Sequence, residues 1–175
     1  MKPASIVSIA LAALVALPAA GRAQAKTNFA GTWAFDQAKS ELGPAQTGRG
    51  GRGGRGGASS VATTLTIQQT AAQITIEGTV GELPISAVYK LDGSQSTNTL
   101  GDIFLSRSKV TWEGPKLVIT TIKDMGQGPN GMMSEDSKEV YSVDGGVLTI
   151  VATTRTTPSA SGREQTRKLV YNKRS

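Results

Sequence analysis

The sequence of 175 residues contains no cysteine and no histidine. Without cysteine there can be no disulfides, so we expect the stability of the fold to come from its core and its backbone pairing. Without histidine, serine–histidine and cysteine–histidine nucleophile systems are excluded, together with the usual zinc, copper and iron sites. We therefore expect a protein that is not an enzyme, has no cofactor and holds no metal ion.

Long apolar runs are also missing, except at the N-terminus. The first 25 residues combine an early cation, Lys2, with an apolar run over residues 6–17 and a small-residue end, Ala23-Gln24-Ala25. This pattern is typical of a secretory signal peptide, and the run is shorter than the roughly 20 residues that span a bilayer. We expect an exported protein, periplasmic or secreted, whose mature chain, residues 26–175, forms a single domain without a transmembrane segment.

Aromatic residues make up only 5% of the chain, and none occurs in residues 39–70, around the repeat GRGGRGGRGG at residues 48–57. An Arg-Gly repeat can bind RNA through phosphate charge and stacking, but an exported chain without a nearby aromatic platform is poorly suited to that partner. We expect residues 43–60 to form a disordered loop. Its cations, Arg49, Arg52 and Arg55, could attract an anionic ligand or an anionic surface.

Most of the remaining sequence alternates between apolar and polar residues, the period of half-buried β-strands. Eight to ten short strands are expected between residues 28 and 173, with a short helical turn at residues 36–41 and long loops at residues 43–60 and 124–137. A meander of this length must close or split to protect its edges. The pattern predicts an all-β fold: a single antiparallel up-and-down barrel, with a β-sandwich as the alternative.

A small barrel can be filled by its own side chains or can hold one small ligand. Alternation can place seven apolar side chains inside as cavity candidates, although about half of such residues only pack together. Few aromatic residues and many threonines indicate a small or partly polar cavity. The cavity candidates are Phe35, Ile67, Ile76, Tyr89, Phe104, Trp112 and Leu169.

Two further patterns match chemical motifs only in part. Ser106 and Lys109 match Ser-x-x-Lys, but on a strand their side chains point to opposite faces, so we expect no nucleophile there. Four acids around residues 124–139 lack the regular spacing of a calcium loop, and a solvated loop is expected instead. Those acids are Asp124, Glu135, Asp136 and Glu139.

The triplet Gly31-Thr32-Trp33 opens the first expected strand and resembles the G-x-W signature of lipocalins and related calycin barrels. The longer pattern over residues 29–40 is similar to a group of exported bacterial lipocalin-like proteins. The resemblance implies that Trp33 plugs the closed end of the barrel and that an arginine near the end of the last strand lies across it. Arg167 is the matching residue here. The chain lacks the mid-chain Thr-Asp-Tyr triplet and the C-terminal helix of many lipocalins, which favours a looser calycin-like barrel.

Fold and composition together predict an exported protein that binds or carries a small hydrophobic or amphipathic molecule without catalysis. The alternative is an envelope interaction or structural protein with a solid barrel, whose basic loop contacts anionic partners. The sequence does not indicate an oligomeric state.

Overall fold

The computed structural model describes residues 26–43, 61–81, 83–100, 104–128, 131–157 and 164–174. The signal-peptide and Arg/Gly-loop predictions lie outside these residues, apart from the first position of the loop, Gly43. Ten antiparallel strands and one 3-10 turn make up the described chain. They are β1 (Gly31–Phe35), η1 (Gln37–Lys39), β2 (Thr64–Gln69), β3 (Gln73–Val80), β4 (Leu83–Lys90), β5 (Ser96–Leu100), β6 (Phe104–Glu113), β7 (Lys116–Gly128), β8 (Gly131–Asp144), β9 (Val147–Thr157) and β10 (Gln165–Lys173).

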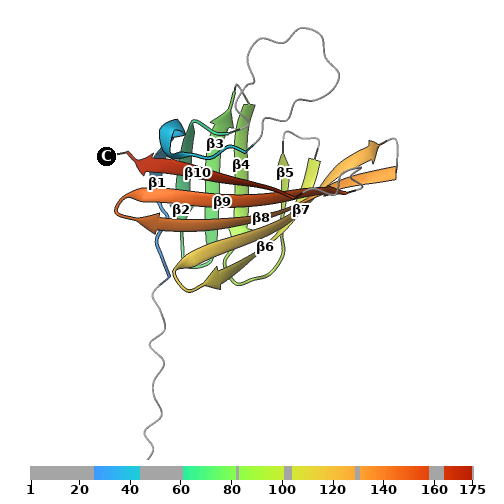
Figure 1. The fold of residues 1–175 in the computed structure, drawn as a ribbon. Helices are drawn as coiled ribbons and strands as arrows, with labels where there is room; N and C mark the ends of the chain where they lie inside the picture. The colour runs from blue at the N-terminus through green and yellow to red at the C-terminus, as the bar shows by residue number, and fades with distance from the viewer. Residues whose placement is uncertain are drawn as a thin grey trace, which may run out of the picture.

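All ten strands belong to one sheet that curls into a nearly closed barrel. Each strand pairs with its sequence neighbours except at β4 and β5, which form the two edges, and β1 pairs with β10, so the sheet runs β4-β3-β2-β1-β10-β9-β8-β7-β6-β5. In Figure 1, β8–β10 cross β2–β4 at a steep angle, and the barrel interior lies between these two groups. The predicted up-and-down barrel is confirmed, and the chain does not form the alternative two-sheet sandwich.

The seam between β4 and β5 is closed by side chains, because these two strands share no backbone ladder. The backbone N–H of Val88 donates to Asn98 Oδ1 at 2.8 Å, and Asn98 Nδ2 donates to the Val88 carbonyl at 3.1 Å. One step along, the N–H of Lys90 donates to Ser96 Oγ at 2.8 Å. Asn98 therefore takes the place of a backbone amide in a neighbouring strand.

Three parts of the strand pattern differ from the sequence prediction. Residues 124–128 and 131–137, part of a segment expected as a loop, instead extend β7 and β8 in a long antiparallel ladder that contains an irregularity between Asp124 and Gly126. The two segments expected as separate strands around Phe104 and Trp112 are joined in β6. The strand β5, with the sequence STNTL, was not expected because it has only one apolar residue. The helical turn expected at residues 36–41 is confirmed as η1.

The core fills the end of the barrel where β1 begins. Trp33 is only 1% exposed, and its indole N–H donates to the Phe29 carbonyl at 3.0 Å. Gly31 has a φ of +145°, a backbone conformation that other residues rarely adopt, so this position favours glycine. Trp33 is therefore a buried structural residue, as the resemblance implied.

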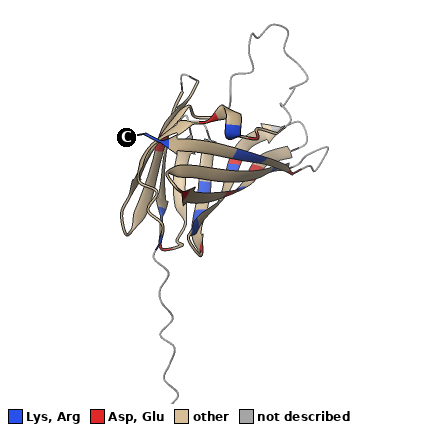
Figure 2. Ribbon diagram, turned by 60° about the vertical axis from the view of Figure 1, so that its left-hand side comes forward, with Lys and Arg blue, Asp and Glu red and all other residues tan. Residues whose placement is uncertain are grey.

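The described surface mixes the two signs of charge. Figure 2 shows basic and acidic positions next to one another on the strands, and exposed pairs such as Lys138 with Glu113, 3.4 Å apart, are examples. Within the described ranges, no helical segment has the length and apolar character that crossing a bilayer requires.

Candidate functional site

Two contiguous pockets, of about 130 and 210 Å³, lie inside the barrel. Three residues line both of them: Ala87 and Tyr89 from β4, and Glu139 from β8. The two volumes are therefore neighbouring parts of one interior space. Together they come near the lower end of the roughly 300–1,000 Å³ of a typical ligand site, which agrees with the small, partly polar cavity expected from the sequence.

The larger pocket has a mainly apolar wall. This wall is formed by the segment just before β2 and by inward side chains of β2, β3, β4, β9 and β10, since period-2 strands bury one face. Its aliphatic residues are Val61, Ala62, Leu65, Ile76, Val80, Ile85, Ala87, Ile150 and Leu169. This side of the interior can accept an aliphatic or ring-shaped apolar group.

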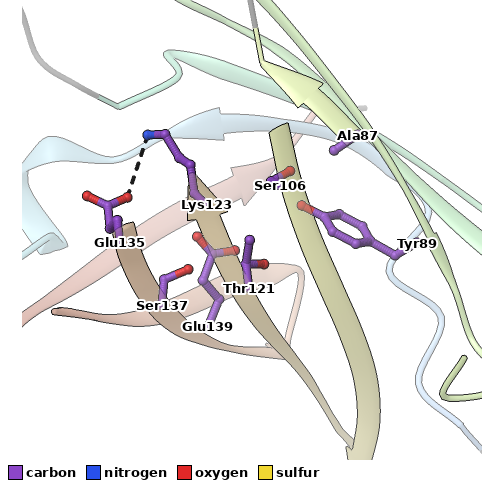
Figure 3. Close-up of a pocket in the computed structure, with 8 residues that line it drawn as sticks. All are labelled: Ala87, Tyr89, Ser106, Thr121, Lys123, Glu135, Ser137 and Glu139. Atoms are coloured by element: carbon purple, nitrogen blue, oxygen red, sulfur yellow. Dashed lines mark ion pairs between the residues drawn. The ribbon is translucent and has the colours of Figure 1, made fainter. Parts of the chain in front are cut away.

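The smaller pocket is lined mostly by residues that carry polar groups. Figure 3 shows Tyr89 extending from β4 toward Ser106, Thr121 and Glu139 on the facing strands. Ser106 is buried at 3% exposure, and its hydroxyl donates to the Asn98 carbonyl at 3.1 Å. Lys123 Nζ and Glu135 Oε1 lie 3.6 Å apart and form an ion pair on the same wall.

Glu139 lies where the polar and apolar sides meet. The hydroxyl of Tyr141 donates to its Oε2 at 2.7 Å. Burial raises the pKa of Glu139 above its ordinary value of 4.5, while the hydrogen bond from Tyr141 and the charge of Arg167 lower that pKa less strongly. The buried carboxyl group is thus held by a donor and a nearby cation, as a buried acid requires.

All three tyrosines of the chain lie around this carboxyl group. Burial, reinforced by the Glu139 charge, raises the pKa values of Tyr89, Tyr141 and Tyr171. Their hydroxyls therefore remain protonated at neutral pH and can donate hydrogen bonds. Among the described residues, none forms a hydrogen bond with the Tyr89 hydroxyl, which faces the smaller pocket in Figure 3.

The predicted cavity residues separate into three groups. Ile76, Tyr89 and Leu169 line the interior space. The others with described side chains belong to the packed core or lie against it: Ile67 is 2% exposed, Phe35 packs on Tyr171 with ring centroids 5.4 Å apart, and Trp112 packs on Phe29 at 6.2 Å. The backbone of Phe104 is in β6, and its side chain lies outside the described part of the structure.

The cation over Trp33 is Lys173 and not the predicted Arg167. Lys173 Nζ lies 5.5 Å from the centroid of the Trp33 ring, and the two residues are register partners of β10 and β1. Arg167 is six residues earlier on the same face of β10, about 20 Å away at the rise of a strand. It lines the larger pocket instead. Arg167 therefore belongs to the interior site and not to the structural motif around Trp33.

Other sequence-predicted groups do not form a site in the described structure. Ser106 faces inward while Lys109 is exposed, so the Ser-x-x-Lys pair is separated as expected. Among the described residues, no three of His, Cys, Asp and Glu come together as metal ligands. The predicted contact residues Arg49, Arg52 and Arg55 lie outside the described residues.

Sequence reasoning missed the polar wall of the interior. Glu135, Ser137, Glu139 and Tyr141 are spaced by two and share the inner face of β8, but half of this run falls in the segment that the sequence predicts as a loop. Had the strand at Tyr141 been extended toward its N-terminus, the same alternation would have placed Glu139 and Glu135 inside. The period-2 alternation is present in this part of the sequence. Its inward positions hold polar residues, so a pattern based on apolar residues does not detect it.

The sequence matches no known family model and no curated protein. Three solved structures share the fold over most of the chain. A "REP1-NXSQ fatty acid transporter" has 13% identity and a TM-score of 0.55, and the match covers 83% of this chain and 96% of that one. A secretory abundant heat soluble protein from Ramazzottius varieornatus has 14% identity and a TM-score of 0.56, with 86% and 98% covered.

The third similar structure is apo lipid binding protein 8 of Caenorhabditis elegans, with 16% identity, a TM-score of 0.55, and 86% and 100% covered. At these identities the likeness shows a shared barrel architecture. The names of the first and third describe lipid transport and lipid binding. The described part of the chain thus forms an antiparallel barrel of ten strands, compared with the eight strands of a lipocalin barrel.

Proposed function

We propose that this protein is exported and binds or carries a small hydrophobic or amphipathic molecule inside its barrel, without catalysing a reaction. The observation that carries the proposal is the interior space, which combines an aliphatic wall from β2, β3, β4, β9 and β10 with a polar wall from β6–β8. A molecule with one apolar and one polar end matches both walls. The fold shared with a fatty acid transporter and a lipid binding protein supports the same function.

Export is supported by the sequence of residues 1–25, which has the cation, apolar run and small-residue end of a signal peptide. An exported carrier of this kind would act in the periplasm or outside the cell. The alternative, an envelope protein with a solid barrel, is less well supported because the described interior contains open space next to Tyr89 and Glu139.

Native mass spectrometry and solvent extraction of the protein purified from its own host test this function. We expect a co-purified molecule in a stoichiometric amount, released by organic solvent. Protein that is free of any such molecule, and that also takes up no apolar fluorescent probe, would contradict carriage.

A pair of variants on one strand tests whether binding occurs inside the barrel. Ala87 lines both pockets, whereas the neighbouring Val88 is exposed on the outer face of β4. Ala87→Phe should fill the space and weaken binding of a neutral probe such as N-phenyl-1-naphthylamine by at least about tenfold. Val88→Phe adds the same ring outside and should leave binding unchanged; equal effects of both variants would place the probe elsewhere.

A further inference from the structure

The described charged residues that line the two pockets are equal in number for the two signs. Among the described residues that line the two pockets, two are cations, Lys123 and Arg167, and two are acids, Glu135 and Glu139. Lys123 pairs with Glu135 at 3.6 Å. Arg167 lies close enough to Glu139 for its charge to favour the ionised carboxyl group. Each interior cation therefore already has an acid whose charge offsets it.

An anionic ligand would meet a poor electrostatic match in this space. A carboxylate near Arg167 would add a second negative charge beside Glu139, and its loss of hydration would not be offset by an unbalanced cation. An ammonium group near Glu139 would likewise add a second positive charge beside Arg167, and its loss of hydration would not be offset by an unbalanced acid. A group that forms hydrogen bonds but carries no charge avoids both costs.

The polar wall offers hydrogen-bonding groups for such a ligand. The Tyr89 hydroxyl faces the smaller pocket and stays protonated, Glu139 can accept, and Ser137 and Thr121 contribute hydroxyls that both donate and accept. These groups lie beside the junction of the two pockets, because Tyr89 and Glu139 line both. A polar end held there leaves the remainder of a ligand against the aliphatic wall.

We infer that the ligand is an uncharged amphiphile whose hydroxyl, carbonyl or amide end is bound by Tyr89 and Glu139, and that Glu139, balanced by Arg167, selects against carboxylate anions. This inference rests on the proposed function. It narrows the ligand class to neutral molecules such as fatty alcohols, acyl amides or hydroxylated ring systems.

The test uses three probes with one chain length: dodecanol, dodecanoate and dodecylammonium. Each is titrated at pH 7.5, below its aggregation concentration, against the full mature protein loaded with N-phenyl-1-naphthylamine. We expect dodecanol to displace the dye at a concentration at least tenfold lower than either charged probe. Equal or tighter binding of dodecanoate would overturn the inference, whereas no binding of any probe would overturn the proposed function with it.

Any apolar pocket binds an uncharged chain more tightly than a charged one. The comparison of variants with the wild type therefore decides whether Glu139 selects the ligand. Glu139→Gln keeps the shape and removes the charge that balances Arg167, so dodecanoate should gain at least tenfold relative to dodecanol. Glu77→Gln makes the same change of net charge on an exposed outer position of β3 and should leave the ranking as in the wild type. An unchanged ranking in Glu139→Gln would show that Glu139 does not select the ligand.

Tyr89→Phe tests the hydrogen bond separately from the charge. Loss of one neutral hydrogen bond should weaken dodecanol binding by about three- to tenfold, with a smaller effect on dodecane, which has no polar end. Equal losses for both probes would mean that Tyr89 contributes shape alone and would contradict its role in binding the polar end.

Discussion

Trp33 shows what a short motif can establish at the level of single residues. Its burial was predictable because a tryptophan in phase with other apolar residues of a strand faces the core. The identity of its cation was not predictable, because Arg167 and Lys173 share one face of β10 and differ only in register against β1. Register between strands about 140 residues apart is set by the closure of the whole barrel and not by local pattern.

Trp33→Ala should destabilise the protein by about 3–5 kcal/mol, because it leaves a large cavity in the core and removes the hydrogen bond to Phe29. Urea unfolding followed by circular dichroism measures the loss. Leu83→Ala is the control, since Leu83 is 71% exposed and its truncation should change stability by less than about 0.5 kcal/mol. A loss below about 1 kcal/mol for Trp33→Ala would mean that the residue is not the plug of the barrel.

Glu139 gives stability a dependence on pH whose sign follows from its environment. The charged and titratable groups that act on it are Tyr89, Tyr141, Tyr171, Arg167 and Glu135. Burial has the largest effect and raises the folded-state pKa of Glu139 above 4.5. Between 4.5 and that higher pKa the folded state binds more protons than the unfolded state, so this contribution to stability falls as pH rises.

Glu139→Gln should therefore remove this slope. We expect the free energy of unfolding of the variant minus that of the wild type to grow as pH increases from about 4.5, and then to level off above the folded-state pKa of Glu139. Each unit of elevation in that pKa corresponds to about 1.4 kcal/mol. Urea unfolding at a series of pH values between 4 and 8 measures the difference, with Glu77→Gln as the control. Parallel pH curves for Glu139→Gln and the wild type would contradict the assignment.

At the level of elements, the predictability of a strand depended on where its apolar residues fell. The strands β2, β3 and β9 have regular aliphatic alternation, and their positions followed from the sequence. In contrast, β5 is nearly all polar, because it closes the seam with Ser96 and Asn98. The β7–β8 hairpin contains glycine and methionine in a segment that is typical of loops, yet long backbone ladders to neighbouring strands hold it in place.

Asn98→Ala should loosen the β4–β5 seam. It removes both hydrogen bonds to the Val88 backbone, at a cost of about 1 kcal/mol because the site is exposed. Hydrogen exchange followed by NMR should show faster exchange of the Val88 amide, while the amide of Ile67 in β2 stays as slow as in the wild type. Thr97→Ala, on an exposed position of the same strand, is the control. Unchanged exchange at Val88 would show that other contacts close the seam.

At the level of the whole molecule, closure of the sheet decides which residues meet. The site combines Ala87 and Tyr89 from β4 with Glu139 from β8 and Arg167 from β10, and these residues lie together only because β1 pairs with β10. The sequence could predict a barrel with a small, partly polar cavity. It could not predict the balanced charges inside, because these depend on contacts across the interior between strands that are not neighbours.

The distribution of charge over the whole chain supports a last prediction. The net charge is +6, and Arg49, Arg52 and Arg55 concentrate positive charge within residues 48–57, whereas the described strands mix both signs. We propose that this segment attracts the protein to anionic surfaces. Long-range attraction of this kind weakens as salt increases, and each arginine near an anionic membrane contributes about 1 kcal/mol.

Replacing the three arginines with glutamine keeps the length of the segment and removes its charge. At low salt, sedimentation with vesicles containing phosphatidylglycerol should show binding of the mature protein weakened at least tenfold, and the difference should disappear near 0.5 M salt. Deletion of residues 48–57 should match the triple variant, and neither change should alter dodecanol affinity, because the residues that line the pockets remain. If the glutamine variant bound vesicles as the wild type does, the segment would not act through charge, and it would be left as a connection between β1 and β2.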